Sequence, residues 1–249
     1  MIHLRNEKEI DAIRECCQIV AGALNYVKTI LSPGLSSIEL DREIESFILK
    51  HNGRPAFKGY QGFPASSCIS INDQVVHGIP DKTVFEKGNI VKVDIGVEKN
   101  GYFGDAAKTF AIEELAEESS RLLKVTRESL YEGIAKAQHG SRLSDISHAI
   151  QTHVEKAGFS IVRQLVGHGI GTQLHEDPQV PNYGRPGKGP RLREGIVLAI
   201  EPMVNCGGHK VVTDDDGWTI RSADGSLSAH FEHTIVIRKN GTEVLTQGI

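Results

Sequence analysis

Two aspartates interrupt a β-hairpin pattern that is otherwise apolar. Asp94 lies within the apolar run Ile90–Val97, and Asp105 follows the turn signal Asn100-Gly101. Asn-Gly between two such runs is a strong signal for a two-residue hairpin turn, which would place Gly96 opposite Asp105. The two aspartates would then lie on one face of the hairpin as diagonal neighbours, roughly 7 Å apart at Cβ.

Binding of a divalent cation is the chemistry that two converging carboxylates favour. Two ionised carboxylates on a buried face need positive charge between them, because burial and mutual repulsion both oppose ionisation. A metal ion supplies that charge. The alternative is that both aspartates face solvent on an edge hairpin, since exposed carboxylates are common in proteins. The hairpin alone leaves these two interpretations open.

Further candidate ligands occur in the second half of the sequence. Glu201 ends the apolar strand pattern "GIVLAIE", and Glu232 interrupts the pattern "AHFEHTIVI". His168 and His175 lie on the glycine-rich segment 167–182. Each acid alone is typical of an exposed strand end, but four carboxylates with one or two histidines form a hard, oxygen-rich set. Such a set suits two divalent ions bridged by carboxylates and a water, and it does not suit a cysteine-based structural zinc site.

The same glycine-rich segment suggests a nucleotide-binding alternative. Its Gly-x-Gly-x-Gly pattern at 167–171 has the composition of a phosphate-binding loop. The spacing departs from G-x-G-x-x-G, and no strand–loop–helix context follows it. We therefore reject nucleotide binding.

Four helices are predicted around the strands that carry these residues. Apolar residues at three- and four-residue steps define them, and Asn6 with Glu9 suits the start of the first. Proline and glycine signals end them. The predicted ranges are 7–32, 36–52, 115–137 and 144–157. The segments 54–97 and 160–249 have the pattern of short strands, turns and loops.

The two halves of the chain resemble each other. "PGLSSIELDREIESFILKHNG" and "HGSRLSDISHAIQTHVEKAG" share a helix start, an apolar spacing and a terminal glycine. "GNIVKVD" likewise matches "GIVLAIE", which aligns Asp94 with Glu201. These repeats predict two α+β halves, at about 1–115 and 116–249, that face each other across a shared site. Without an obvious linker between them, we expect a single domain, 1–249.

Composition and charge narrow the function classes. The 249 residues are 39% hydrophobic and 24% charged, and the formal net charge of −4 offers no general attraction for nucleic acid. No run of 18 apolar residues predicts a membrane span, and the N-terminus lacks the apolar core of a secretory signal. Four cysteines without a C-x-x-C pair predict a reduced, cytoplasmic protein.

Six short motifs follow one another along the chain in a specific order and spacing. They are "VVHGIP", "VDIG", "NGYFGD", "GHGIGTQLHEDP", "AIEP" and "AHFEHTI". This series closely resembles the type I methionine aminopeptidases of metallopeptidase family M24, over nearly the whole chain. The resemblance implies an α+β pita-bread fold, with two pseudo-symmetric halves around a central antiparallel sheet. It also implies a metal-dependent hydrolase that removes the initiator methionine from nascent proteins and peptides when the second residue is small.

The resemblance implies a role for each candidate site residue. The implied metal ligands are Asp94, Asp105, His168, Glu201 and Glu232. Asp105 and Glu232 would bridge two divalent ions (Co, Mn, Fe, Zn or Ni), and a water activated by both ions would hydrolyse the first peptide bond. Glu201 would also transfer protons. His77 and His175 would hydrogen-bond the scissile amide and stabilise the tetrahedral intermediate.

The methionine pocket that the resemblance implies is apolar and partly aromatic. Its lining residues would be Tyr60, Phe63, Cys68, Leu174 and Trp218. The alternative for all five is an ordinary core position, although Trp218 follows "DDDG" in a polar loop. Three positions depart from other members of the family. Phe57 stands where some carry a cysteine, Phe103 where many carry a histidine and Gly96 where some carry a threonine. None of these departures removes a ligand.

Two alternative functions share the implied fold. An X-Pro peptidase usually carries an additional N-terminal domain, for which a first helix near residue 7 leaves no room. A non-catalytic binding protein would be expected to have lost ligands, and all five are present. We therefore expect a monomeric enzyme that acts on nascent polypeptide N-termini near the ribosome, without direct binding to nucleic acid or membrane.

Overall fold

The computed structural model describes residues 1–249. The helices are α1 (Glu7–Ile30), α2 (Ser37–Lys50), α3 (Glu117–Lys136) and α4 (Leu143–Lys156), with one 3-10 turn at Tyr60–Gly62. The strands are β1 (Arg54–Pro55), β2 (Cys68–Ile71), β3 (Gln74–Val76), β4 (Ile90–Lys99), β5 (Tyr102–Ala111), β6 (Ser160–Ile161), β7 (Val166–Gly169), β8 (Glu176–Pro181), β9 (Val197–Ile200), β10 (Met203–Asn205), β11 (Val211–Thr213), β12 (Ile220–Ser222), β13 (Ser228–His230), β14 (His233–Arg238) and β15 (Gly241–Val244). None of the helices combines the length and apolar character that crossing a bilayer requires.

Side-chain caps determine where the first two helices begin. Asn6 accepts a hydrogen bond from the backbone N–H of Glu9 at 3.1 Å, and the Glu9 carboxylate accepts the N–H of Asn6 at 2.9 Å. Ser36 and Glu39 form the same reciprocal box at α2. Such boxes satisfy amide donors that the first turn of a helix leaves unpaired. All four predicted helices are confirmed, with ends that differ by no more than two residues.

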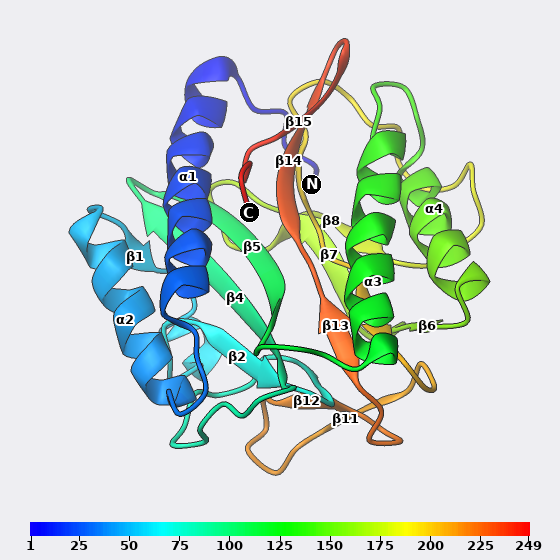
Figure 1. Ribbon diagram of the computed structural model, residues 1–249. Coiled ribbons are helices and arrows are strands. Elements are labelled where there is room, and N and C mark those ends of the chain that lie inside the picture. The colour runs from blue at the N-terminus through cyan, green and yellow to red at the C-terminus, as the bar shows by residue number, and fades with distance from the viewer.

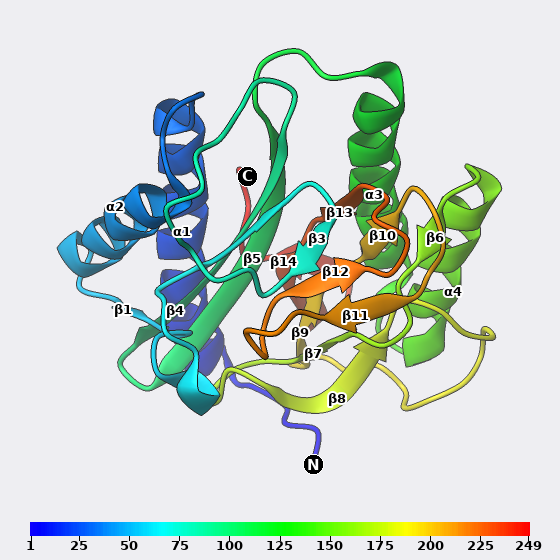
Figure 2. The same ribbon diagram turned by 90° about the horizontal axis from the view of Figure 1, so that it is seen from below.

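Helices cover the strands from two opposite sides. In Figure 1, α1 lies beside the hairpin of β4 and β5 with α2 packed against α1 and β1, whereas α3 lies beside β13 with α4 on its outer side. Figure 2 shows the short strands β3, β11 and β12 between the two groups. One apolar cluster lies under each helix pair, including Leu24 and Ile44 in the first half and Leu122 and Ile150 in the second. Each half therefore has its own core.

The hairpin of β4 and β5 has the predicted register, with Asp105 directly opposite Gly96. Asn100 and Gly101 have φ values of 55° and 79°, the left-handed conformations that a tight hairpin turn of this kind requires. The register places Asp94 on the same face as Asp105. β4 also pairs with β1 and β2, so the hairpin is not at the edge of its sheet on that side.

Hydrogen bonds from β5 to the region of β14 join the two halves. The backbone N–H of Glu232 donates to the carbonyl of Ala107 at 2.9 Å, and the hydroxyl of Thr234 donates to the carbonyl of Asp105 at 2.7 Å. β14 belongs to a five-stranded sheet in the order β15-β14-β9-β7-β8, and all its neighbours pair antiparallel. This seam brings the carboxylate-bearing hairpin against the strands of the second half.

Candidate active site

Five side chains from both halves line one cavity of about 220 Å³. The first half contributes Asp94 on β4 and Asp105 on β5. The second half contributes His168 on β7, Glu201 directly after β9 and Glu232 shortly before β14. The structure thus brings together all five residues that the sequence analysis selected as candidate metal ligands.

The geometry of the five side chains fits a divalent cation. Asp105, His168 and Glu232 each place one potential ligand atom within 4.8 Å of the others. The Nε2 atom of His168 lies 3.6 Å from the carboxylate of Glu201. One carboxylate oxygen on each of Asp94, Asp105 and Glu232 is buried and has no hydrogen-bond partner. Because an unpaired buried oxygen is costly, these atoms suit contact with a cation.

Burial disfavours negative charge on these carboxylates. It raises the pKa of Asp94 to about 7, and burial together with the nearby Glu232 and Asp94 raises the pKa of Asp105 well above its ordinary value. Burial, and then neighbouring carboxylates that include Asp94, also raise the pKa values of Glu201 and Glu232 well above the ordinary value. No lysine or arginine lines the cavity. The alternative of exposed acids is wrong, because Asp105 and Glu232 are only 3% and 2% exposed.

Glycines on both sides of His168 allow β7 to fit between β8 and β9. A Cβ atom at Gly167 would lie 2.4 Å from the carbonyl oxygen of Ala199, and one at Gly169 would lie 2.2 Å from that of Asp177. The Nδ1 atom of His168 lies 2.9 Å from the carbonyl oxygen of Gly169, so this nitrogen donates a hydrogen bond. Nε2 then carries the lone pair and faces the carboxylates, as a metal-binding histidine requires.

Two more histidines, His77 and His175, border the cavity. The Nδ1 atom of His175 lies 2.8 Å from the hydroxyl oxygen of Tyr60, and its ring centre lies 4.3 Å from that of His168. Burial and the neighbouring His175 lower the pKa of His77 to about 4, and burial lowers the pKa of His175. Both rings are therefore neutral near pH 7, and each can donate one hydrogen bond to a substrate.

An apolar wall adjoins the carboxylates within the same cavity. All five residues that the sequence analysis assigned to a methionine pocket line it: Tyr60, Phe63, Cys68, Leu174 and Trp218. Phe63 and Trp218 meet edge to face with ring centres 5.2 Å apart, and Cys68 lies opposite Asp94 in the pairing of β2 with β4. Phe57 extends the wall and packs directly on Gly96, where a Cβ atom would lie 2.5 Å from its ring.

His230 is a neighbour of the carboxylates that the sequence analysis did not select. It is 1% exposed, neither ring nitrogen has a hydrogen-bond partner, and Nε2 lies 3.7 Å from the carboxylate of Glu201. Burial lowers its pKa to about 3, so the ring is neutral. Its position in the sequence could have indicated this location. His230 lies two residues before Glu232 in an extended segment, where alternate side chains share a face.

The chain is similar to methionine aminopeptidases from several bacteria. The model of metallopeptidase family M24 matches residues 11–239. The methionine aminopeptidase of Clostridium perfringens is 54% identical, and the match covers 99% of both chains. Methionine aminopeptidase 1 of Bacillus subtilis is 50% identical over 99% of this chain and 100% of its own. The solved structure of methionine aminopeptidase from Thermotoga maritima has a TM-score of 0.98 at 46% identity and covers both chains fully.

A more distant likeness concerns the fold alone. The prolidase of Pyrococcus horikoshii has a TM-score of 0.80 at 22% identity, over 99% of this chain and 64% of the prolidase. The predicted pita-bread fold is confirmed by these structures. The full-length matches at 50% identity or more exclude the X-Pro peptidase and the non-catalytic binding protein as readings of the chain. By these matches the chain belongs to the methionine aminopeptidases of metallopeptidase family M24, which are metal-dependent hydrolases.

Proposed function

We propose that the protein hydrolyses the first peptide bond of nascent proteins and peptides that begin with methionine and have a small second residue. The observation that carries this proposal is that the carboxylate cluster and the aromatic wall share one cavity. A methionine side chain against that wall would bring its own peptide bond to the carboxylates. Each contact of a thioether with an aromatic ring contributes roughly 0.3–1.5 kcal/mol.

The same cavity would hold two divalent ions. The ligands would be Asp94, Asp105, His168, Glu201 and Glu232. Asp94, Asp105 and Glu232 each have an unpaired buried oxygen that a bound cation would contact. Bound there, the ions would supply Lewis acidity toward the peptide carbonyl and would make water more acidic. This oxygen-rich donor set accepts Co, Mn, Fe, Zn or Ni, and metal availability decides among them.

Three residues of the chain would transfer protons and stabilise the negative charge that develops during the reaction. The side chain of Glu201 is 14% exposed, which leaves it accessible to water in the cavity. Glu201 would accept a proton from the attacking water and deliver it to the leaving nitrogen, so that water adds across the bond and free methionine is released. His77 and His175 would donate hydrogen bonds to the carbonyl oxygen, on which negative charge develops.

The cellular setting that we propose is a reducing one. All four cysteines are free, and Cys16, Cys17 and Cys68 are buried, which suits a cytoplasmic protein. We infer a monomer that meets its substrates as they emerge near the ribosome. Size-exclusion chromatography with light scattering checks the oligomeric state, since a monomer has the mass of one chain. Co-sedimentation with translating ribosomes checks the proximity to the ribosome.

Peptide cleavage after metal depletion tests the proposed reaction. The depleted protein receives Mn(II), Co(II) or Fe(II) and is offered Met-Ala-Ser, Met-Leu-Ser and an X-Pro peptide. We expect metal-dependent release of methionine from Met-Ala-Ser alone. Cleavage of the X-Pro peptide, or no release from any peptide with any of these metals, would contradict the proposal.

A further inference from the structure

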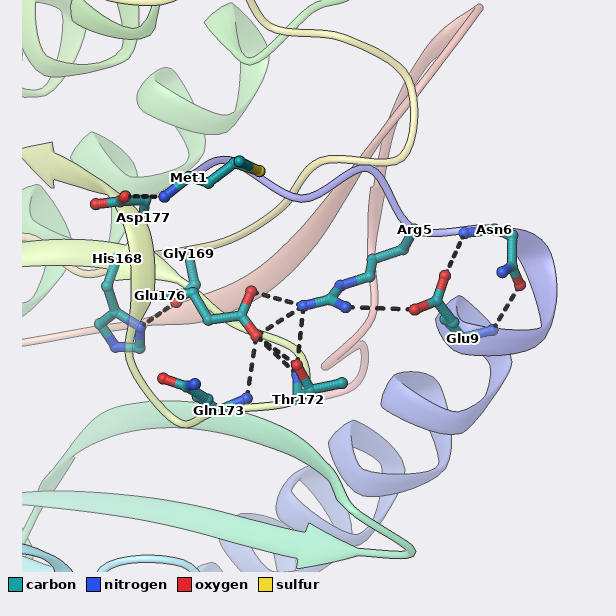
Figure 3. A network of polar contacts seen from close by, with 10 residues as sticks. All are labelled: Met1, Arg5, Asn6, Glu9, His168, Gly169, Thr172, Gln173, Glu176 and Asp177. Atoms are coloured by element: carbon teal, nitrogen blue, oxygen red, sulfur yellow. Dashed lines mark hydrogen bonds and ion pairs between the residues drawn. The ribbon is translucent and has the colours of Figure 1, made fainter.

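The segment 170–175 joins β7 to β8 and carries two residues of the cavity, Leu174 and His175. It is neither helix nor strand, so few backbone hydrogen bonds fix it. The carboxylate of Glu176, the residue after His175, accepts the backbone N–H groups of Thr172 at 2.8 Å and Gln173 at 3.0 Å. Figure 3 shows these bonds converging on one carboxylate. The shape of the segment therefore depends on the position of the Glu176 side chain.

Arg5 holds that carboxylate from the other end of the chain. Its Nη2 atom lies 2.6 Å from both oxygens of Glu176, and the two side chains are only 6% and 7% exposed. Arg5 also contacts Glu9, whose carboxylate accepts a hydrogen bond from Arg5 Nη1 at 3.3 Å (Figure 3). Breaking a buried pair by removing one partner is costly, because the other charge stays buried without compensation.

Arg5 is itself fixed in place. Its backbone N–H donates to the carbonyl of Gly195 at 2.8 Å, near the start of β9. Its guanidinium packs against Gly171, where a Cβ atom would be 2.5 Å from Nη2. The carbonyl of Gly171 in turn accepts the N–H of Phe103 at 2.9 Å, on β5. The ion pair thus ties the segment to Arg5, and the segment's own backbone ties it to β5.

We propose that Arg5 and Glu176 are positioning residues for the peptidase reaction, because their buried ion pair holds segment 170–175 with His175 and Leu174 facing the cavity. This inference rests on the proposed function, in which His175 contacts the substrate. Neither Arg5 nor Glu176 lines the main cavity, so both act through the residues that they hold. The backbone N–H groups and the guanidinium outweigh the effect of burial and keep the pKa of Glu176 below its ordinary value.

Substitution of Arg5 tests the proposal. In Arg5→Ala we expect kcat/KM for Met-Ala-Ser to fall about 10- to 100-fold, since a displacement of about 1 Å in a contacting residue has effects of that order. Arg5→Lys keeps the charge and should recover part of the loss. Glu176→Gln keeps one acceptor oxygen but loses the ion pair, and it should resemble Arg5→Ala. Hydrogen exchange at the amides of Thr172 and Gln173 should accelerate in both variants.

Two controls separate positioning from general destabilisation. Arg14→Ala breaks the half-buried pair of Arg14 with Glu243, which does not touch the segment, and should leave kcat/KM unchanged. In a His175→Ala background, Arg5→Ala should cause a much smaller loss of kcat/KM than in the wild type, because only the effect through Leu174 remains.

Three results would overturn the inference. The first is folded Arg5→Ala and Glu176→Gln variants with wild-type kcat/KM. The second is amide exchange at Thr172 and Gln173 that neither variant accelerates. The third is an equal loss from Arg5→Ala with and without His175. If the wild-type protein itself releases no methionine, the proposed function fails instead, and the exchange comparison still decides whether the ion pair holds the segment.

Discussion

At the scale of single residues, His168 shows how its surroundings select one protonation state. Burial first, and then the neighbouring His175, lower the pKa of His168 to about 3. The hydrogen bond to the carbonyl of Gly169 then decides which nitrogen keeps the proton. A neutral ring with a free Nε2 atom is the form that binds metal, so no proton has to leave the His168 ring before binding near pH 7.

Glu201→Gln tests the proposed proton transfer. Glutamine has nearly the same shape but cannot accept the proton, so we expect the rate of methionine release to fall about 10²- to 10⁴-fold. Thermal unfolding and circular dichroism should show an intact fold. Glu118→Gln, at an exposed position on α3, is the matched control and should keep full activity. Near-normal activity of Glu201→Gln would exclude the proposed role.

Gly96 and Phe57 form a coupled pair that substitution should reveal. A methyl group at position 96 would lie 2.5 Å from the Phe57 ring, so we expect Gly96→Ala to lower the free energy of unfolding by about 1–3 kcal/mol. Phe57→Leu should relieve the clash, and the double variant should lose less than the sum of the single losses. Urea unfolding measures all four proteins. Strictly additive losses would show that the two positions are independent.

At the scale of elements, local rules predict the hairpin but not the loop. Asn100-Gly101 sets the register of β4 and β5 within a few residues, and that prediction is confirmed. The segment 170–175 is held by Arg5, which is 171 positions away from Glu176. No periodicity or turn signal encodes such a pairing, so the sequence could not show it. The pocket residues likewise needed a family resemblance, because a buried aromatic residue has the same pattern in a core and in a cavity wall.

The Glu176 carboxylate should make the stability of the protein fall at acid pH. The pKa of Glu176 is lower in the folded protein than its ordinary value of 4.5, so its contribution is present above that pH and is lost as the pH falls further. Between pH 5 and pH 3, we expect the free energy of unfolding to fall more in the wild type than in Glu176→Gln. Urea titrations of both proteins without metal provide the comparison. Equal slopes would contradict the ion pair as an acid-sensitive contact.

At the scale of the whole molecule, the cavity lies between two cores. Asp94 and Asp105 come from the first half, and His168, Glu201 and Glu232 come from the second. Hydrogen bonds from the backbone and from buried side chains join β5 to the region of β14. The internal repeats predicted two halves, and each has a core of its own. We propose that the two halves nevertheless unfold together as one domain. When either half unfolds, the other half loses its hydrogen-bond partners across the seam.

Calorimetry tests both the single domain and the metal binding. We expect one unfolding transition with and without metal. A metal at 100 times its dissociation constant should stabilise the fold by about 2.7 kcal/mol and raise the melting temperature. Mg(II) at the same concentration should have a smaller effect, since it gives up its bound water reluctantly and demands near-ideal octahedral geometry. Two separate transitions would contradict the single domain, and a melting temperature unchanged by every metal would contradict the metal centre.

The seam also has a consequence for synthesis of the protein, because its two sides are translated at different times. Asp105 and its partner Thr234 are 129 positions apart in the chain. At roughly 5–20 residues per second, a ribosome needs about 6 to 26 s to add that stretch. Until the end of this interval Asp105 lacks Thr234, and Glu232 is added only two residues earlier. The burial of the hairpin carboxylates is therefore complete only after the second half has been synthesised.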